Sequence, residues 1–303
     1  MTAASPYLEN GKPVVRPSFC LFVDLLGFST RILDCESSAQ SNTLLAKLEE
    51  VIREQREVWN RYGSASQYKL FSDCFVFGSP VRDAHALGEP ELGECVMEMT
   101  SYQLPMLRAG FIVRGAITFG EMHLSQDLCF GKALVEAYKL EHKTAVYPRV
   151  ILSDDVRVLV EEHISWYSNP ASSPQALELL RDKDDRFFVN YLEATNYAGD
   201  GPDWEVLARH RDLILSGLRR FRHNARVRPK YEWLREYHDH FCTSDRICYT
   251  AEWGPPPDGF DSLLIAKTRR RDRPSRFSQI VEGDSHVMSL KARPFSLPSL
   301  TEE

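Results

Sequence analysis

The sequence contains no long apolar run and no recognisable secretion signal. No stretch approaches the roughly 20 apolar residues that a membrane-spanning helix needs. The first 17 residues, MTAASPYLENGKPVVRP, are polar and carry no apolar core of the kind found in signal peptides. We therefore expect a soluble, cytoplasmic protein without membrane association.

Cysteine pairs and excess positive charge are also absent. The seven cysteines include no Cys-x-x-Cys pair, and an odd number without a secretion signal favours reduced thiols over a disulfide framework. A formal net charge of -6 argues against a protein that coats nucleic acid, because phosphate backbones attract basic domains. With 303 residues, 43% of them hydrophobic, the chain can form one large domain or a catalytic domain with an appendage.

The order of apolar runs and helical patterns predicts an α+β protein. Strands are expected at 18–25, 67–71, 74–78, 111–124 and 146–154, and helices at 41–62, 91–108 and 130–141. We expect Pro105 to kink or shorten its helix and the strand that contains Gly120 to bend there. This βαββαβ order predicts helices on one face of a sheet in which the first strand and the hairpin lie side by side.

Two aspartates stand within apolar strands, where an unpaired charge is costly to bury. Asp24 lies in CLFVDLLGFS and Asp73 lies in KLFSDCFVF. If they meet, the two carboxylates raise each other's pKa unless a cation lies between them, and oxygen ligands suit Mg²⁺ or Mn²⁺. The alternative is that each aspartate caps a helix or pairs with a basic residue.

Two basic residues lie in the same predicted strands. Because side chains alternate along a strand, we expect Lys69 to share a face with Asp73 and to reach a base or phosphate; the alternative is a solvated lysine. Arg114 opens a strand near the centre of the sheet. Its guanidinium there needs an anion, and a phosphate or a structural carboxylate would serve equally well.

Four segments resemble, in order and approximate spacing, the motifs of class III nucleotide cyclases. They are FVDLLGFS, KLFSDCFVF, RGAITFG and FGKALVEAYKLE, within residues 18–154. The resemblance implies an α+β, ferredoxin-like βαββαβ cyclase fold with a helical C-terminal extension. We expect an N-terminal segment, a cyclase domain, the helical extension and a loosely ordered tail, at 1–17, 18–165, 166–253 and 254–303.

Departures from the purine cyclase pattern point to a narrower group. Four residues replace the usual glycine, asparagine, arginine and purine-reading acidic residue, namely Ser72, Val135, Lys139 and Lys132. The sequence is more similar to the bacterial pyrimidine cyclases of Pycsar antiphage defence. This resemblance implies conversion of UTP, or less often CTP, to the 3′,5′-cyclic monophosphate and pyrophosphate. It also implies a homodimer with active sites at the interface and a separate effector activated by the product.

The resemblance implies roles for individual residues. Asp24, Asp73 and the carbonyl of Leu25 would hold two Mn²⁺ or Mg²⁺ ions. Gly27 and Phe28 would bring backbone amides to the phosphates. The remaining candidates are Arg114 and Lys139 for catalysis, and Tyr68, Lys69 and Tyr62 for reading the base.

Other interpretations stay open. The chain could be a non-catalytic relative that binds a nucleotide or a protein, or another metal enzyme of similar fold; it has no Gly-Gly-acidic-acidic-Phe turn of the diguanylate type. The basic segment 209–230 is expected to be an amphipathic packing helix, with RNA binding as the alternative. His238, His240 and Cys242 alternate in a predicted helix, a spacing that suits zinc poorly.

Overall fold

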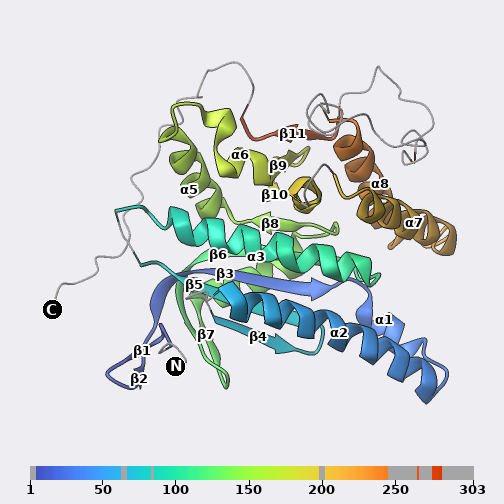
Figure 1. Cartoon of the computed structure of the whole chain (residues 1–303), viewed down its shortest axis with the longest axis horizontal. Coiled ribbons are helices and arrows are strands. Elements are labelled where there is room, and N and C mark those ends of the chain that lie inside the picture. The colour runs from blue at the N-terminus through green and yellow to red at the C-terminus, as the bar shows by residue number, and fades with distance from the viewer. Residues whose placement is uncertain are drawn as a thin grey trace.

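A nine-stranded sheet forms the centre of the computed structural model, which describes residues 5–62, 67–82, 85–197, 202–244, 265 and 275–281 (Figure 1). Its strands are β3 (Arg16–Leu25), β4 (Gln67–Phe71), β5 (Cys74–Pro80), β6 (Val113–Leu124), β7 (Cys129–Gly131), β8 (Val150–Leu152), β9 (Leu179–Asp182), β10 (Phe187–Val189) and β11 (Phe277–Gln279). A separate hairpin is formed by β1 (Leu8–Glu9) and β2 (Lys12–Pro13).

The helices are α1 (Phe28–Leu33), α2 (Ser38–Tyr62), α3 (Glu89–Arg108), α4 (Lys132–Lys143), α5 (Asp154–Ser165), α6 (Pro174–Glu178), α7 (Trp204–Arg220) and α8 (Arg228–Cys242). Two 3₁₀ turns lie at Pro170–Ser172 and Tyr191–Tyr197. Among the described residues, no helix combines the length and the apolarity needed to cross a membrane.

The strand order confirms the expected ferredoxin-like core. Strands β6, β3, β5 and β4 are neighbours in that order, all antiparallel. In chain order this is the fourth, first, third and second strand, the arrangement of a βαββαβ unit. The first strand therefore pairs with the second strand of the hairpin, as expected, and β8 then extends the sheet parallel to β6.

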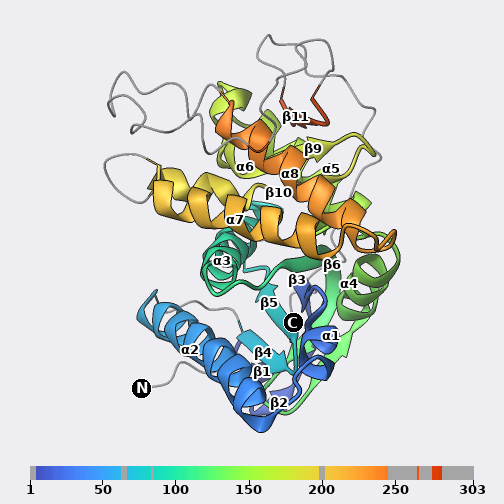
Figure 2. The same ribbon diagram turned by 90° about the vertical axis from the view of Figure 1, so that its right-hand side faces the viewer.

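Alternation along β3 separates two apolar faces. Phe19, Leu21 and Val23 join the core formed with α2, α3 and α5, whereas Cys20 and Phe22 join a second core beneath α4. Helices α7 and α8 pack on a third cluster beside α4 (Figure 2). The expectation of helices on one face only was therefore wrong, because α4 covers the second face and α7 and α8 of the extension pack beside it.

Several element boundaries differ from those predicted. Residues 129–131 form β7 rather than the start of a helix, and α4 begins after Gly131, whose φ of 137° ends the strand. β6 runs unbroken past Gly120 because it pairs with β3 from Arg16 to Leu25. Pro105 does not shorten α3, which continues to Arg108; the proline lies only one turn from the end of the helix.

The C-terminal extension holds more than helices. Helices α7 and α8 lie where a helical extension was expected, but β9 and β10 add two short strands to the sheet. Within the segment expected to be a loose tail, β11 pairs with β9. The remainder of that tail, apart from 265 and 275–281, lies outside the described residues.

Packing of α7 against α8 depends on a missing side chain. A Cβ atom at Gly217 of α7 would overlap the ring of Tyr231 of α8, whereas nothing lies within 4 Å of a Cβ placed on Gly93 of α3. We therefore expect Gly217→Ala to lower the free energy of unfolding by about 1–3 kcal/mol through overpacking. The matched change Gly93→Ala should raise it by up to about 1 kcal/mol, because alanine favours helices.

Denaturant titration of both variants would measure this difference. Equal effects of the two substitutions would contradict the close contact between α7 and α8.

Candidate metal and nucleotide site

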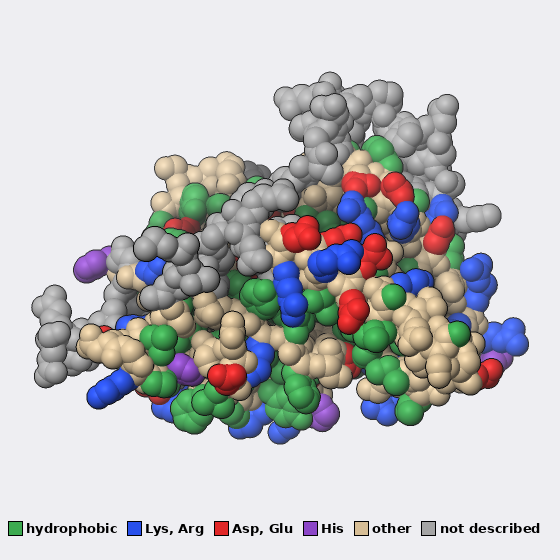
Figure 3. All heavy atoms as spheres, turned by 60° about the horizontal axis from the view of Figure 1, so that its bottom comes forward, with side chains coloured by type: hydrophobic (Ala, Val, Ile, Leu, Met, Phe, Trp, Pro, Cys, Tyr) green, Lys and Arg blue, Asp and Glu red, His purple; other side chains and the backbone are tan. Residues whose placement is uncertain are grey.

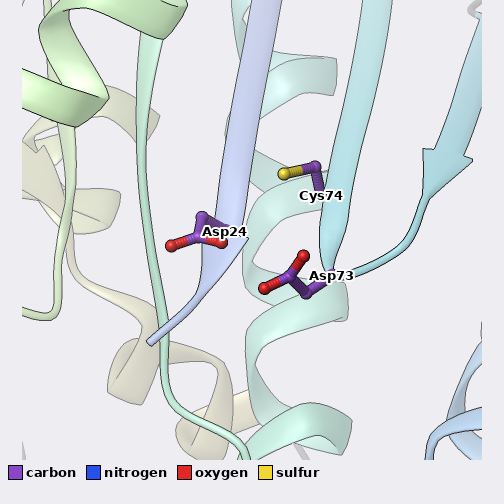
Figure 4. A group of neighbouring side chains, drawn as sticks. All are labelled: Asp24, Asp73 and Cys74. Atoms are coloured by element: carbon purple, nitrogen blue, oxygen red, sulfur yellow. The ribbon is translucent and has the colours of Figure 1, made fainter. Parts of the chain in front are cut away.

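Asp24 and Asp73 meet at one end of the central strands. Asp24 is the last but one residue of β3 and pairs with Cys74 of β5, so both side chains leave the same face of the sheet. Asp73 follows Ser72, whose φ of 56° makes the tight turn between β4 and β5. The Leu25 amide donates to the carbonyl oxygen of Asp73 at 3.2 Å, which ties the strand end to the turn. Figure 4 shows the three side chains gathered between β3 and β5.

The side chains of Asp24, Asp73 and Cys74 can offer donors to one cation. One potential ligand atom from each lies within 4.8 Å of the others, and this is the one group of that kind among the described residues. Burial first, and then the two aspartates, raise the pKa of the Cys74 thiol to about 12. A protonated thiol is a poor ligand, so the two carboxylates remain as hard oxygen donors suited to Mg²⁺ or Mn²⁺. The residues present fit such an ion.

Asp24 belongs to a partly buried chain of ion pairs that the motifs did not predict in full. Arg114 donates to Oδ2 of Asp24 from Nη2 at 3.2 Å and from Nε at 3.3 Å. The same Nη2 lies 2.8 Å from Oε1 of Glu141, on α4, whose side chain is 4% exposed. Arg114 thus pairs with structural carboxylates, one of the two alternatives that the sequence left open. Its hydrogen bonds to Asp24 go to Oδ2 and leave Oδ1 for another partner.

Glu141 is the residue that sequence reasoning missed. It ends the motif FGKALVEAYKLE, so a signal existed, but only the packing of α4 on β6 brings it to Arg114. Its Oε1 makes the ion pair without a hydrogen bond from any described group. The carboxylate therefore positions Arg114 by charge, and Arg114 in turn holds Asp24.

The electrostatics of the cluster favour protonation in the absence of a cation. Burial raises the pKa of Asp24; Arg114 opposes this, while the neighbouring Asp73 adds to it. Burial also raises the pKa of Glu141, against the charge of Arg114. A cation between the aspartates would remove their repulsion and return the pKa of Asp24 toward its ordinary range.

These shifts predict a pH dependence for the metal-free protein. The folded state keeps protons on Asp24 and Glu141 at pH values where the unfolded chain, with ordinary carboxyl pKa values of about 4, has released them. Since the folded state binds more protons, stability falls as pH rises from about 4 through the raised pKa values. We expect Asp24→Asn to flatten this fall.

The test is to measure Tm from about pH 4 to pH 8, in the presence of a chelator, for the unmodified protein and for Asp24→Asn. The expected effect is a smaller fall of Tm with rising pH in Asp24→Asn. Parallel curves would contradict a raised pKa at Asp24.

The other predicted residues lie at different distances from the aspartates. Lys69 is on the same sheet face as Cys74, since it pairs with Val76. Burial raises the pKa of Cys129 in β7, and the charge of Lys69 opposes this. Asp73 itself lies in the turn, so strand alternation does not relate it to Lys69. Tyr68 points to the opposite face, where its ring lies 6.2 Å from that of Phe75. The side chain of Tyr62 lies outside the described residues.

Gly27 and Phe28 form the turn that follows β3. Gly27 has a φ of 74°, a left-handed conformation that suits glycine, and α1 begins at Phe28. The Phe28 ring is buried against Phe111, so only its backbone could face a ligand. Lys139 is exposed on α4 and forms no ion pair with a described residue. The roles assigned to these residues and to the Leu25 carbonyl stay predictions.

The alternating histidines in α8 do not form a metal site. His238 is buried, and its Nδ1 lies 3.1 Å from Nδ1 of His210, while its Nε2 lies 3.6 Å from Sγ of Cys242. Nε2 of His210 in turn lies 3.0 Å from the hydroxyl of Tyr191. These contacts form a linear chain rather than a set of donors around one point, which agrees with the poor spacing for zinc.

No protein-family model and no curated protein matches the chain. Among solved structures, the guanylyl cyclase Cya2 is 15% identical with a TM-score of 0.38, over 49% of this chain and 79% of its own. The guanylyl cyclase domain of the RhoGC fusion protein from the aquatic fungus Blastocladiella emersonii is 11% identical with a TM-score of 0.38, over 58% and 95%. A class III adenylyl cyclase-like ATP-binding protein from Pseudomonas aeruginosa is 16% identical with a TM-score of 0.41, over 60% and 40%. With TM-scores below 0.5, these similarities carry no conclusion about activity, and the fold assignment rests on the strand order.

Proposed function

We propose that the protein is a pyrimidine nucleotide cyclase that converts UTP to 3′,5′-cyclic UMP and pyrophosphate. The observation that carries the proposal is the meeting of Asp24 and Asp73 at the ends of the central strands, with donor atoms within 4.8 Å. Two carboxylates in one half-buried site suit divalent ions that also bind phosphates. The choice of a pyrimidine, and of uracil over cytosine, rests on the sequence resemblance.

The reaction forms one bond and breaks one. The ribose 3′-oxygen attacks the α-phosphorus and loses its proton to solvent, while the bond from the α-phosphorus to the β-phosphate oxygen breaks and pyrophosphate leaves with the electron pair. Divalent ions at Asp24 and Asp73 would lower the pKa of the 3′-hydroxyl and offset the phosphate charge. Asp24 and Asp73 bind them; Arg114 and Glu141 keep Asp24 in place. Lys69 lies on the site face of the sheet, where it can contact the base or a phosphate.

We also propose that the active unit is a homodimer. Five large apolar side chains are exposed on the elements around the site. Phe71 lies on β4, Leu128 and Phe130 lie before and in β7, and Val135 and Tyr138 lie on α4. Figure 3, in which the bottom of Figure 1 comes forward, shows apolar side chains in groups on that side of the molecule. Exposed groups of this kind are typical of protein interfaces. In a dimer, the exposed Lys139 would belong to the site of the partner.

A second candidate function is a nucleotide-binding protein without catalysis. The observation that favours it is the ion pair between Arg114 and Asp24, which already explains a buried carboxylate in the absence of a metal. The chain also has Val135 and Lys139 where the cyclase motif has asparagine and arginine. Asp73 forms no ion pair with a described residue, which favours the metal site and hence the cyclase.

The test is to incubate the full chain with Mn²⁺ and each of the four ribonucleoside triphosphates and to identify products by mass spectrometry. Cyclic UMP alone would support the proposal, and cyclic CMP alone would change the substrate to CTP. Binding of a triphosphate without any cyclic product, in the presence of Mn²⁺, would favour the non-catalytic alternative. On the same resemblance, we propose that the product activates a separate effector in antiphage defence.

A further inference from the structure

A basic segment without acidic residues, 219–230, lies beside the aspartate site. The connection between α7 and α8, residues 221–227, and the first turn of α8 lie at the same end of the molecule as α1 and the end of β3 (Figure 2). An ion pair of 2.8 Å between Arg220 and Asp34 fixes the end of α7 to the end of α1. Leu26, which follows β3, packs against the same apolar cluster as Tyr231. The C-terminal extension therefore borders the site within one chain.

Contacts within the connection hold it in one conformation. The Asn224 side chain accepts from the amides of Arg226 and Val227 at 3.1 and 3.0 Å. Nη1 of Arg228 donates to the carbonyl oxygen of Arg222 at 2.9 Å. The Phe221 ring also stacks on Tyr231, with 5.5 Å between ring centroids. The position of Lys230 is thus set by the fold rather than by a free loop.

Lys230 is a partly buried residue in the first turn of α8, at the end of the molecule that holds α1 and the end of β3. Burial lowers its pKa, the charges of Arg114 and Arg226 lower it further, and Asp24 and Glu141 oppose this. Burial raises the pKa of Glu141, and the charges of Arg114, His142 and Lys230 oppose this. Neither Lys230 nor Arg226 has a carboxylate within ion-pair distance among the residues that the structure describes. Because Lys230 and Arg226 lack such a partner, their positive charges can bind an anionic ligand.

We propose that Lys230, with Arg226, binds the terminal phosphates of the nucleoside triphosphate, so that the C-terminal extension completes the substrate site of its own chain. The proposal rests on the proposed function, because it assigns a polyphosphate to the ligand. Ions held by Asp24 and Asp73 would lie on one side of the phosphates and the two basic side chains on the other. In this proposal the basic segment 209–230, for which RNA binding was the alternative, binds the phosphates of a single nucleotide instead.

The test uses inorganic pyrophosphate as the probe, in Mg²⁺, with binding to the full chain measured by calorimetry. Lys230→Gln removes a charged hydrogen bond and should therefore weaken pyrophosphate binding at least about tenfold. We expect a smaller loss for Arg226→Gln, since that side chain is exposed, and recovery to within about threefold of the original for Lys230→Arg. Lys47→Gln, which removes an exposed lysine from α2, is the matched control and should bind as the unmodified protein does.

Thermal unfolding of Lys230→Gln checks that the fold is intact. Equal binding by Lys230→Gln and the unmodified protein, or no binding of pyrophosphate by the unmodified protein, would overturn the assignment of Lys230. Neither result bears on whether UTP is cyclised, which the product assay decides separately. Conversely, pyrophosphate binding that is lost in Lys230→Gln, with no cyclic product from any triphosphate, would keep the phosphate site and reject the cyclase.

Discussion

Replacing Asp73 by asparagine is expected to lower kcat/KM for cyclic nucleotide formation by at least about 10³-fold, and to abolish tight Mn²⁺ binding. The amide has nearly the shape of the carboxylate but lacks the charge that a divalent ion requires. Asp73 is the better choice for the test because it forms no ion pair with a described residue, so its loss leaves the contacts around it intact. Removing one of two neighbouring carboxylates should raise Tm by about 1–4 °C in the metal-free protein.

The control is Asp212→Asn, which makes the same change on the exposed side of α7. It should leave turnover and Mn²⁺ affinity unchanged. If Asp73→Asn kept its affinity for Mn²⁺, the site between Asp24 and Asp73 would have to be abandoned, whatever the activity.

The largest effect on stability is expected from Asp182→Ala. Asp182 is buried and accepts from Arg149, from Nε1 of Trp233 at 2.8 Å and from Nε of Arg276 at 2.6 Å. These contacts join β9, α8 and the segment before β11. Arg149 is 1% exposed, so losing this partner leaves a buried charge whose one remaining ion-pair partner among the described residues is Asp184. We expect the free energy of unfolding to fall by about 3–5 kcal/mol.

Asp212→Ala serves as the control, because the pair of Asp212 with Arg211 is exposed at Asp212 and contributes at most about 1 kcal/mol. Denaturant titration would compare the two variants. A loss below about 1 kcal/mol for Asp182→Ala would mean that the buried pairs do not hold the extension to the sheet.

The sequence predicted the core of the fold because the strands and helices of 18–143 are long enough to show their periodicity. It also predicted the meeting of the two aspartates. Asp24 ends an apolar strand and Asp73 lies in a two-residue interruption between strands, so any antiparallel pairing of those strands brings them close. Both predictions rest on local patterns, which tertiary packing preserved.

The strand β8 was predicted too long, at 146–154, and β9 and β10 were missed, because three or four residues do not distinguish a strand from a buried turn. Gly131 was placed within a helix because its φ, which separates β7 from α4, cannot be read from composition. Tyr68 and Lys69 were separate candidates for reading the base; as adjacent strand residues they face opposite sides of the sheet, and Lys69 is the one on the face of Cys74.

The surroundings of Glu141 and Lys230 were decided by the tertiary structure. Each is an ordinary charged residue of an amphipathic helix, and helical periodicity gives no sign that either faces a site. Glu141 comes to Arg114 because α4 packs on β6, and Lys230 comes to this end of the molecule because α8 follows α7, whose last residue Arg220 pairs with Asp34 after α1. The sequence by itself determined the strands, their order and the two carboxylates at their ends, since these follow from local hydrophobic patterns. The charges that surround those carboxylates come from segments far apart in the chain, and only packing between the segments sets their distances.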